Sequence, residues 1–278
     1  QTVHFGKQYP DRFFNVGAAE ANLVDVAGGM ALCGLKPIAS TFAIFLTLKA
    51  TEQIRNNICY NNLPVILIGG YAGLSDSFDG ASHQSITDLA IMRAMPNMKV
   101  MVPGDAIEMK QALNLALEVD GPVYIRSSRN PSPVLFRDHP PMEHGKIRRI
   151  KSGNDITIAV CGIPTYMAIE AAGKLGKEAI SVDLLNVSSI KPLDKDTILE
   201  SVKKTGRILT VEEHNIIGGL GGAISELLCK EHLVYAEHIG IEDVFAETGP
   251  YIDLLAKYGI SEESIVHKAR KLIQKSKT

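Results

Sequence analysis

The stretch that decides the fold is residues 12–34, RFFNVGAAEANLVDVAGGMALCG. A short apolar run at 13–16 is typical of a strand and ends at Gly17. An Ala- and Gly-rich helical pattern follows over 21–32, with one carboxylate, Glu20, in its first turn. A strand that leads directly into a helix predicts an α/β unit.

A carboxylate in a first helical turn has two interpretations. Free backbone N–H groups and the helix dipole favour negative charge there, so Glu20 can simply stabilise the helix end. If the strand end and the helix start lie under a ligand, the site is dry, and a carboxyl in a dry site favours its protonated form. A protonated carboxyl can donate a hydrogen bond to a ring nitrogen.

Outward from this stretch, the first part of the chain alternates apolar runs with helical patterns. The expected strands are 13–16, 36–43, 64–70, 99–103 and 122–127, and the expected helices are 21–32, 45–60, 86–95 and 106–119. Continuous apolar strands between helices indicate a parallel sheet covered on both faces. Right-handed crossovers then bring the segments after the strands to one edge, where such sheets bind ligands.

A change of composition divides the chain. Residues 129–146 carry four prolines, which forbid a helix and favour extended chain. A second alternation follows, with strands expected at 156–161, 179–185, 208–212 and 235–239 and helices at 166–175, 195–204, 222–232, 251–258 and 262–275. We therefore predict an α/β protein of two successive domains, 1–130 and 148–278, joined by a linker at 131–147; each domain is a mostly parallel sheet flanked by helices.

Composition excludes several classes of function. Lys and Arg total 29 against 31 Asp and Glu, so no excess of positive charge predicts a nucleic-acid or membrane-surface partner. No apolar run approaches membrane-spanning length, and the first residues lack the hydrophobic core of a signal peptide. The four cysteines (Cys33, Cys59, Cys161 and Cys229) are far apart in apolar contexts, which predicts buried, reduced thiols of a cytoplasmic protein and no cysteine metal site.

The expected strand–helix connection at 69–88, GGYAGLSDSFDGASHQSITD, is long for a compact domain. It contains Asp79 and His83, and a histidine near a carboxylate can exchange protons or bind a hydroxylated substrate. The alternative is a solvated surface loop that contains a histidine by chance.

Two further features are open to two interpretations. Phe42 and Phe45 lie three residues apart just past a strand end. They are either core residues or a platform on which a flat heterocycle stacks. The glycine-rich turn at 218–222 precedes a helix and can hold phosphate, but it does not match GxGxxG or a P-loop, so close helix–sheet packing or a subunit contact is favoured.

Taken together and in order, these motifs resemble the transketolase family. The segments at 10–34, 36–56, 79–109 and 122–129 resemble its pyrimidine-binding domain, and 182–194, 211–222 and 247–261 resemble its C-terminal domain. The resemblance covers nearly the whole chain.

The resemblance implies a role for each matching residue. Glu20 falls on the family's glutamate that donates to the pyrimidine ring of thiamine diphosphate, which promotes loss of the thiazolium proton. Phe42 and Phe45 fall on its aromatic cage, whose third ring is Leu48 here. Asp79 and His83, in the D-G-x-x-H motif, would contact substrate hydroxyls, and Arg129 would hold the sugar phosphate. The implied reaction moves a two-carbon ketol unit from a ketose phosphate to an aldose phosphate.

The chain departs from the family pattern in three ways. Tyr71 stands where many transketolases have a phosphate-contacting histidine, which puts substrate choice in doubt. The first strand–helix unit of this domain, which in the family carries an Arg and a Ser near the substrate, is missing before Gln1. The sequence contains no G-D-G motif, which in the family holds the diphosphate and a Mg²⁺ or Ca²⁺ ion.

The resemblance therefore implies the C-terminal subunit of a split transketolase, with no metal ligands of its own. A separate N-terminal subunit would carry the diphosphate and metal site, in a heterotetramer with two copies of each chain. Three alternatives remain open. They are a synthase of 1-deoxyxylulose 5-phosphate, the β subunit of a 2-oxoacid dehydrogenase, and a non-catalytic scaffold of the same fold.

Overall fold

The first sheet of the computed structural model, which describes residues 2–275, has five strands in the order β1-β2-β4-β3-β8. Four of them are parallel, and β8 pairs antiparallel with β3 at one edge. The strands are β1 (Ile38–Phe42), β2 (Ile66–Gly70), β3 (Lys99–Met101), β4 (Val123–Arg126) and β8 (Ser189–Lys191). The strands expected at 36–43, 64–70, 99–103 and 122–127 are confirmed.

The second sheet also combines four parallel strands with one antiparallel edge strand, in the order β10-β9-β6-β7-β5. Its strands are β5 (Arg148–Lys151), β6 (Ile156–Val160), β7 (Val182–Asn186), β9 (Arg207–Asn215) and β10 (Tyr235–Ile241). The predicted fold class, two α/β units with mostly parallel sheets, is confirmed.

The sequence reasoning missed both antiparallel edge strands. β5 reads RRIK and β8 has three residues, so neither has the apolar run by which a buried strand is recognised. β8 comes from the second half of the chain but completes the sheet of the first half, where Lys191 pairs with Val100. The division into domains at 1–130 and 148–278 therefore stays a prediction.

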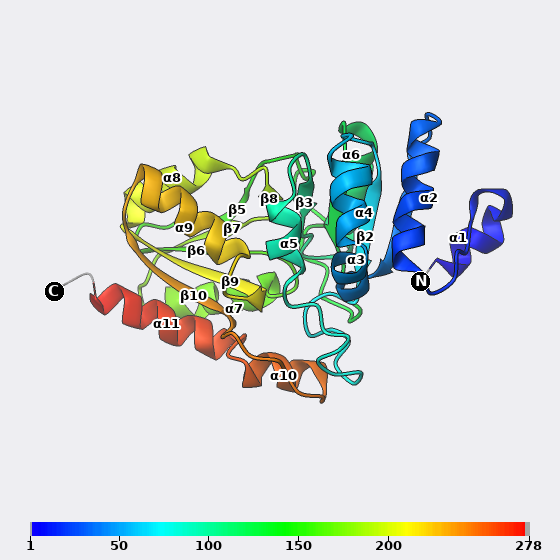
Figure 1. Ribbon diagram of the computed structural model, residues 1–278. Coiled ribbons are helices and arrows are strands. Elements are labelled where there is room, and N and C mark those ends of the chain that lie inside the picture. Colours follow the sequence, from blue (N-terminus) through cyan, green and yellow to red (C-terminus); the bar gives the residue numbers. More distant parts are fainter. Residues whose placement is uncertain (1, 276–278) are drawn as a thin grey trace.

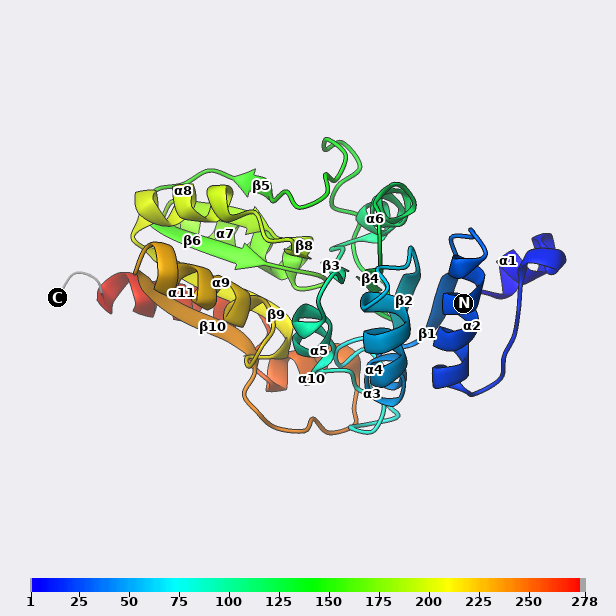
Figure 2. The same cartoon turned by 45° about the horizontal axis from the view of Figure 1, so that its top comes forward.

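Helices cover both faces of the first sheet (Figures 1 and 2). On one face, α6 (Ala106–Glu118) packs on alternate strand residues such as Ile66. On the other face, neighbours such as Leu67 pack on α2, α3, α5 and the π-helix η2. These elements are α2 (Glu20–Leu32), α3 (Ala43–Lys49), the one-turn α4 (Thr51–Gln53), η2 (Ile54–Cys59) and α5 (Asp88–Ala94).

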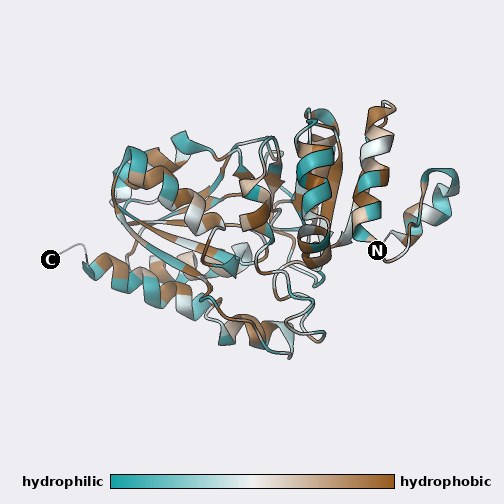
Figure 3. Ribbon diagram, viewed as in Figure 1, coloured by the Kyte–Doolittle hydropathy of each residue, from teal (hydrophilic) through white to brown (hydrophobic). Residues whose placement is uncertain are grey.

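The second sheet is covered in the same way. On one face, α7 (Thr165–Lys177), α10 (Tyr251–Lys257) and α11 (Glu262–Lys275) pack on the sheet. On the other face, α8 (Lys195–Thr205) and α9 (Leu220–Glu231) share one apolar core with α5 and η2 of the first half. The amphipathic α11 buries Ile265, Val266, Ala269 and Leu272, and Figure 3 shows hydrophobic and hydrophilic residues along its length.

Two expected elements take another form. Residues 13–16 are not a strand: they have no pairing partner and Phe14 is 60% exposed, in a connection between η1 (Pro10–Arg12) and α2. The short α1 (Val3–Gln8) precedes them at the far end of the molecule and buries no residue (Figure 1). The helix expected at 45–60 divides into α3, α4 and η2, and the Thr47 hydroxyl bonds back to the carbonyl of Ala43 there.

The proline-rich segment is ordered without a helix, as expected. Phe136 is buried, and the Asp105 carboxylate accepts hydrogen bonds from the backbone N–H groups of Leu135 and Phe136. Asp105 is also the N-cap of α6, where it accepts from the N–H of Glu108 at 2.8 Å. One side chain thus joins the segment to the first sheet's helix layer.

Candidate functional site

Glu20 is the first residue of α2, as the sequence predicts. The preceding turn uses Gly17 at a φ of +79°, and the Asn15 side chain accepts a hydrogen bond from the Gly17 N–H at 2.9 Å. Glu20 is buried, and its Oε2 accepts a hydrogen bond from Lys49 Nζ at 3.4 Å. The carboxyl therefore faces the end of α3 and not open solvent.

Three aromatic rings stack beside this carboxyl. Phe42, at the end of β1, stacks on Phe45 with 5.6 Å between ring centroids and 8° between planes. Tyr71, directly after β2, stacks on the Phe42 ring at 4.2 Å and 20°. Its φ of +58° is uncommon for a residue with a side chain and indicates a backbone held in place by its surroundings. Tyr71 supplies the third ring of the stack, whereas Leu48 is exposed.

His83 lies against the same stack. Its ring packs edge-on to Phe45 at 5.1 Å and to Phe42 at 6.1 Å. The Nδ1 atom is 3.0 Å from the hydroxyl of Ser82. The structure thus brings together Glu20, the two predicted phenylalanines and His83.

Arg129 reaches the stack from the segment after β4. Its guanidinium lies 5.1 Å from the centroid of the Tyr71 ring and donates to Asp76 Oδ1 at 2.6 Å. The pKa of Asp76 is raised, mainly by burial and further by the neighbouring Asp79 carboxylate. The hydrogen bond from Arg129 and its charge oppose this shift. The strand ends of β1, β2 and β4 therefore meet at one edge, as the topology predicts.

The connection between β2 and α5 is packed against the second half of the chain. The N–H of Leu74 donates to Glu213 Oε1 at 2.7 Å, and the Tyr251 hydroxyl donates to Glu213 Oε2 at 2.8 Å. A Cβ at Gly73 would overlap the Glu213 carboxylate, so only glycine fits there. The two ends of this connection, 72–77 and 84–86, are buried, whereas Phe78, Asp79 and Ser82 between them are exposed, so both interpretations of Asp79 and His83 stay open.

Glu213 is a group that the sequence reasoning did not assign to the site. Burial raises its pKa to about 7, against the lowering effects of Arg126, Tyr251 and the Leu74 N–H. The available signal was a pair of acids, Glu212 and Glu213, inside an apolar strand. Such acids are almost never buried without partners.

A buried ion pair lies where the connection between β2 and α5 ends, at the start of α5. Arg126 Nε donates to Asp88 Oδ2 at 2.8 Å, and the Tyr124 hydroxyl donates to the same oxygen at 2.7 Å. Arg126 also donates to the backbone carbonyls of Ser85 and Glu213. Burial opposes ionisation of Asp88, but Arg126 and the hydrogen bonds hold its pKa below the usual range.

The glycine-rich turn before α9 serves close packing, as favoured above. The buried Glu212 carboxylate accepts from the N–H groups of Leu220 at 2.7 Å and Gly221 at 2.8 Å. These donors at the helix start would otherwise be available to a phosphate. A Cβ at Gly219 would overlap the Glu212 side chain.

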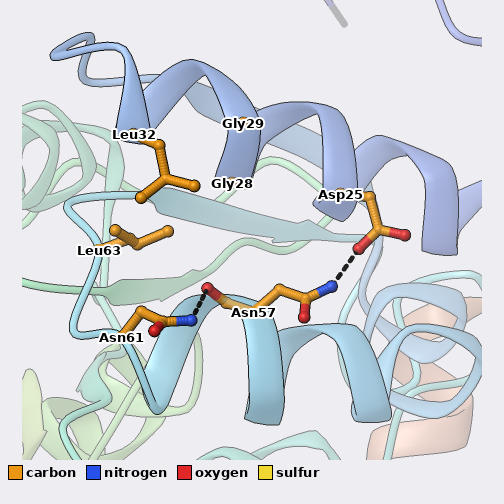
Figure 4. A pocket seen from close by; sticks show the side chains of 7 residues that line it. All are labelled: Asp25, Gly28, Gly29, Leu32, Asn57, Asn61 and Leu63. Atoms are coloured by element: carbon orange, nitrogen blue, oxygen red, sulfur yellow. Dashed lines mark hydrogen bonds between the residues drawn. The ribbon is translucent and has the colours of Figure 1, made fainter.

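Other candidate features lie away from this cluster. A cavity of about 300 Å³ lies between α2 and η2 (Figure 4) and contains no predicted site residue; it is lined by Asp25, Gly28, Gly29, Leu32, Asn57, Asn61 and Leu63.

Within residues 2–275 no group of three or more His, Cys, Asp or Glu side chains is arranged to hold a metal ion. Cys59 and Cys161 are buried, but the prediction of buried thiols is wrong for Cys33 and Cys229, which are exposed at the ends of α2 and α9. Of the helices described, none is both long and apolar enough to cross a membrane.

Comparison with known proteins agrees with the fold. Residues 1–133 match the transketolase pyrimidine-binding domain family, and residues 145–265 match the transketolase C-terminal domain family. The chain therefore belongs to the transketolase family.

Similar proteins include separate subunits. A putative transketolase C-terminal section of Methanocaldococcus jannaschii is 38% identical, over 99% of this chain and 87% of that protein. A 6-deoxy-6-sulfo-D-fructose transketolase subunit, SqwH, of Clostridium sp. strain MSTE9 is 34% identical, over 98% of this chain and 84% of that protein. A solved structure described as a split gene transketolase, inactive beta4 tetramer, has a TM-score of 0.92 and 42% identity, over 99% of this chain and 89% of that one.

Longer enzymes are similar too. A 1-deoxy-D-xylulose-5-phosphate synthase of Desulfotalea psychrophila is 36% identical over 98% of this chain, which spans 43% of that protein.

Proposed function

We propose that this chain is the C-terminal subunit of a thiamine diphosphate-dependent transketolase. It transfers a two-carbon ketol unit from a ketose phosphate to an aldose phosphate, together with a separate N-terminal subunit. The observation that carries the proposal is the position of Glu20, a buried carboxyl at a helix start beside the stacked Phe42 and Phe45 rings.

The Glu20 carboxyl and the stacked aromatic rings fit the pyrimidine end of thiamine diphosphate. A pyrimidine ring needs a flat aromatic face and a carboxyl near its ring nitrogen, and the chain offers both within one cluster. When bound, thiamine diphosphate supplies a nucleophilic carbon and an electron sink. The diphosphate end needs a metal and its ligands, for which no cluster exists among the described residues.

In this proposal Glu20 holds the proton that the pyrimidine ring nitrogen shares. Glu20 is the first residue of α2, and its Oε2 lies 3.4 Å from Lys49 Nζ. The stacked rings of Phe42, Phe45 and Tyr71 would offer an apolar face to the pyrimidine ring and keep water from that side. Positioning and proton transfer are then the contributions of this chain.

The substrate would lie beyond the stack. His83, against Phe42 and Phe45, and the exposed Asp79 would bind and orient sugar hydroxyls. Arg129 is half exposed, so its guanidinium can meet an anionic group while it stays paired with Asp76. Tyr71 holds that guanidinium by its ring face.

The partner is an N-terminal transketolase subunit that carries the diphosphate and the Mg²⁺ or Ca²⁺ ion. The similar solved structure, described as a split gene transketolase and an inactive beta4 tetramer, supports this. We propose active sites at the interface, in a heterotetramer with two copies of each chain.

Calorimetry tests the need for the partner. Thiamine diphosphate with Mg²⁺ should bind tightly to the mixture of both subunits and weakly to this chain alone. Tight, metal-dependent binding by this chain alone would contradict the split-subunit proposal.

A coupled assay with the partner tests the reaction. Turnover of a ketose phosphate donor with an aldose phosphate acceptor is expected. The second candidate, a synthase of 1-deoxyxylulose 5-phosphate, is favoured by the similarity to the Desulfotalea enzyme. Turnover of pyruvate would indicate either this synthase or the β subunit of a 2-oxoacid dehydrogenase. Cofactor binding without any turnover would indicate a scaffold.

A further inference from the structure

Lys49 lies where the proposed pyrimidine ring would bind. It is the last residue of α3, and its side chain is 57% exposed. Its Nζ atom is 3.4 Å from Glu20 Oε2 and 4.2 Å from the centroid of the Phe45 ring. The ammonium group thus bridges the carboxyl and the aromatic face.

These two contacts are the ones that an aminopyrimidine would need. A ring stacked on Phe45 with its nitrogen at the Glu20 carboxyl requires the volume between them. An ammonium at 4.2 Å above the ring and 3.4 Å from the carboxylate occupies that volume. Both groups cannot be present at once.

We propose that Lys49 competes with the cofactor's pyrimidine for Glu20 and Phe45, so that it lowers the affinity of the site and selects for ligands that can displace it. This rests on the proposed function. Lys49 is a specificity-determining residue and not a catalytic one, because it leaves the site when the ring binds.

The expected effect is moderate. Half of the Lys49 side chain is already in solvent, so its stem can turn outward without breaking core contacts. The ion pair and the cation–π contact are each weak when solvent reaches them. Their loss should weaken cofactor binding by about three- to tenfold relative to a chain without the ammonium.

The test uses the complete complex with the N-terminal subunit. Binding of thiamine diphosphate with Mg²⁺ is measured by calorimetry for the wild type, Lys49→Met and Lys49→Arg. Methionine keeps an unbranched stem and removes the charge, whereas arginine keeps the charge. Lys110→Met, at an exposed lysine on α6 across the first sheet, is the matched control.

Tighter binding by Lys49→Met, by about three- to tenfold, is expected, with Lys49→Arg and Lys110→Met close to the wild type. A thiazole diphosphate fragment, which lacks the pyrimidine, should bind all four complexes equally. Equal or weaker binding of the cofactor by Lys49→Met would overturn the proposal, as would tighter binding of the fragment. No cofactor binding by the wild-type complex would instead refute the proposed function.

Discussion

The side chains at the carboxyl ends of the parallel strands are accessible to solvent in the first sheet and buried in the second. At the first sheet, Phe42, Tyr71, His83 and Arg129 are at least partly exposed and contact one another in one cluster. At the second sheet, Glu212 and Glu213 are buried, and each accepts hydrogen bonds from backbone or tyrosine donors of the same chain.

The difference shows how one architecture serves two purposes. At the carboxyl edge of each sheet, helices begin directly after strands, and the first backbone N–H groups of those helices have no partner within the helix. In the second sheet the chain's own carboxylates take those donors, and the edge holds the connection that follows β2. In the first sheet the side chains remain accessible, and that edge is the one suited to a ligand.

The largest effect is expected at Glu20. Glu20→Gln keeps the size of the side chain but cannot cycle a proton, so hydrogen–deuterium exchange at the reactive carbon of thiamine diphosphate should slow by orders of magnitude. Exchange is measured by NMR after acid quench, in the complex with the partner subunit. Asp25→Asn, one turn further along α2, is the control, and unchanged exchange in Glu20→Gln would remove Glu20 from its role.

The buried Arg126–Asp88 pair, whose arginine also donates to the Glu213 carbonyl at the second edge, should give the next largest effect. Arg126→Met leaves Asp88 buried without its charged partner, which costs about 3–5 kcal/mol of unfolding free energy. Urea unfolding followed by circular dichroism measures it. Lys257→Met, which removes the exposed pair with Glu247, should change stability little; an equally small effect of Arg126→Met would show that the pair does not hold the edges together.

Glu213 predicts a pH dependence. Its pKa is about 7 in the folded chain against 4.5 for an ordinary glutamate, so the native state binds more protons than the unfolded state between these values. Its contribution is fully present below pH 4.5 and is lost as the pH rises towards 7, by roughly 3 kcal/mol at most.

Unfolding free energies of the wild type and Glu213→Gln at several pH values test this. The wild type should lose stability relative to Glu213→Gln as the pH rises from about 5 to 7. Parallel profiles for the two proteins would mean that Glu213 does not titrate in this range.

The smallest effect is expected at the glycine-rich turn. Gly219→Ala places a methyl group against the Glu212 carboxylate and should cost about 1–3 kcal/mol. Gly173→Ala, inside α7 where an added Cβ meets nothing within 4 Å, should stabilise the chain by about 0.5–1 kcal/mol. Thermal unfolding compares them, and opposite signs are expected; equal shifts would contradict the packing role of Gly219.

Much of the fold was predictable because apolar periodicity reports burial directly. The parallel strands and the helix that begins at Glu20 follow from local patterns. The antiparallel β5 and β8 were missed because short polar edge strands carry no such pattern. The apolar run at 13–16 failed as a strand because, among residues 2–275, no strand lies beside it to pair with it.

The residues of the candidate site also fall into two groups, those assigned from the sequence and those found only in the structure. Glu20, Phe42, Phe45, Asp79, His83 and Arg129 were assigned from motif order, and their roles stay predictions. Tyr71 as the third ring, Lys49 between Glu20 and Phe45, and the Arg126–Asp88 pair depend on residues that are far apart in the sequence.

By itself, the sequence determined the two α/β units, the family resemblance and the residue types at each strand end, because these depend on local periodicity and motif spacing. Only the tertiary structure decided which strand end is accessible and which is filled by the chain's own carboxylates. The physical reason is that burial and hydrogen-bond satisfaction arise from contacts between distant segments, as where Glu213 accepts from Leu74 and Tyr251.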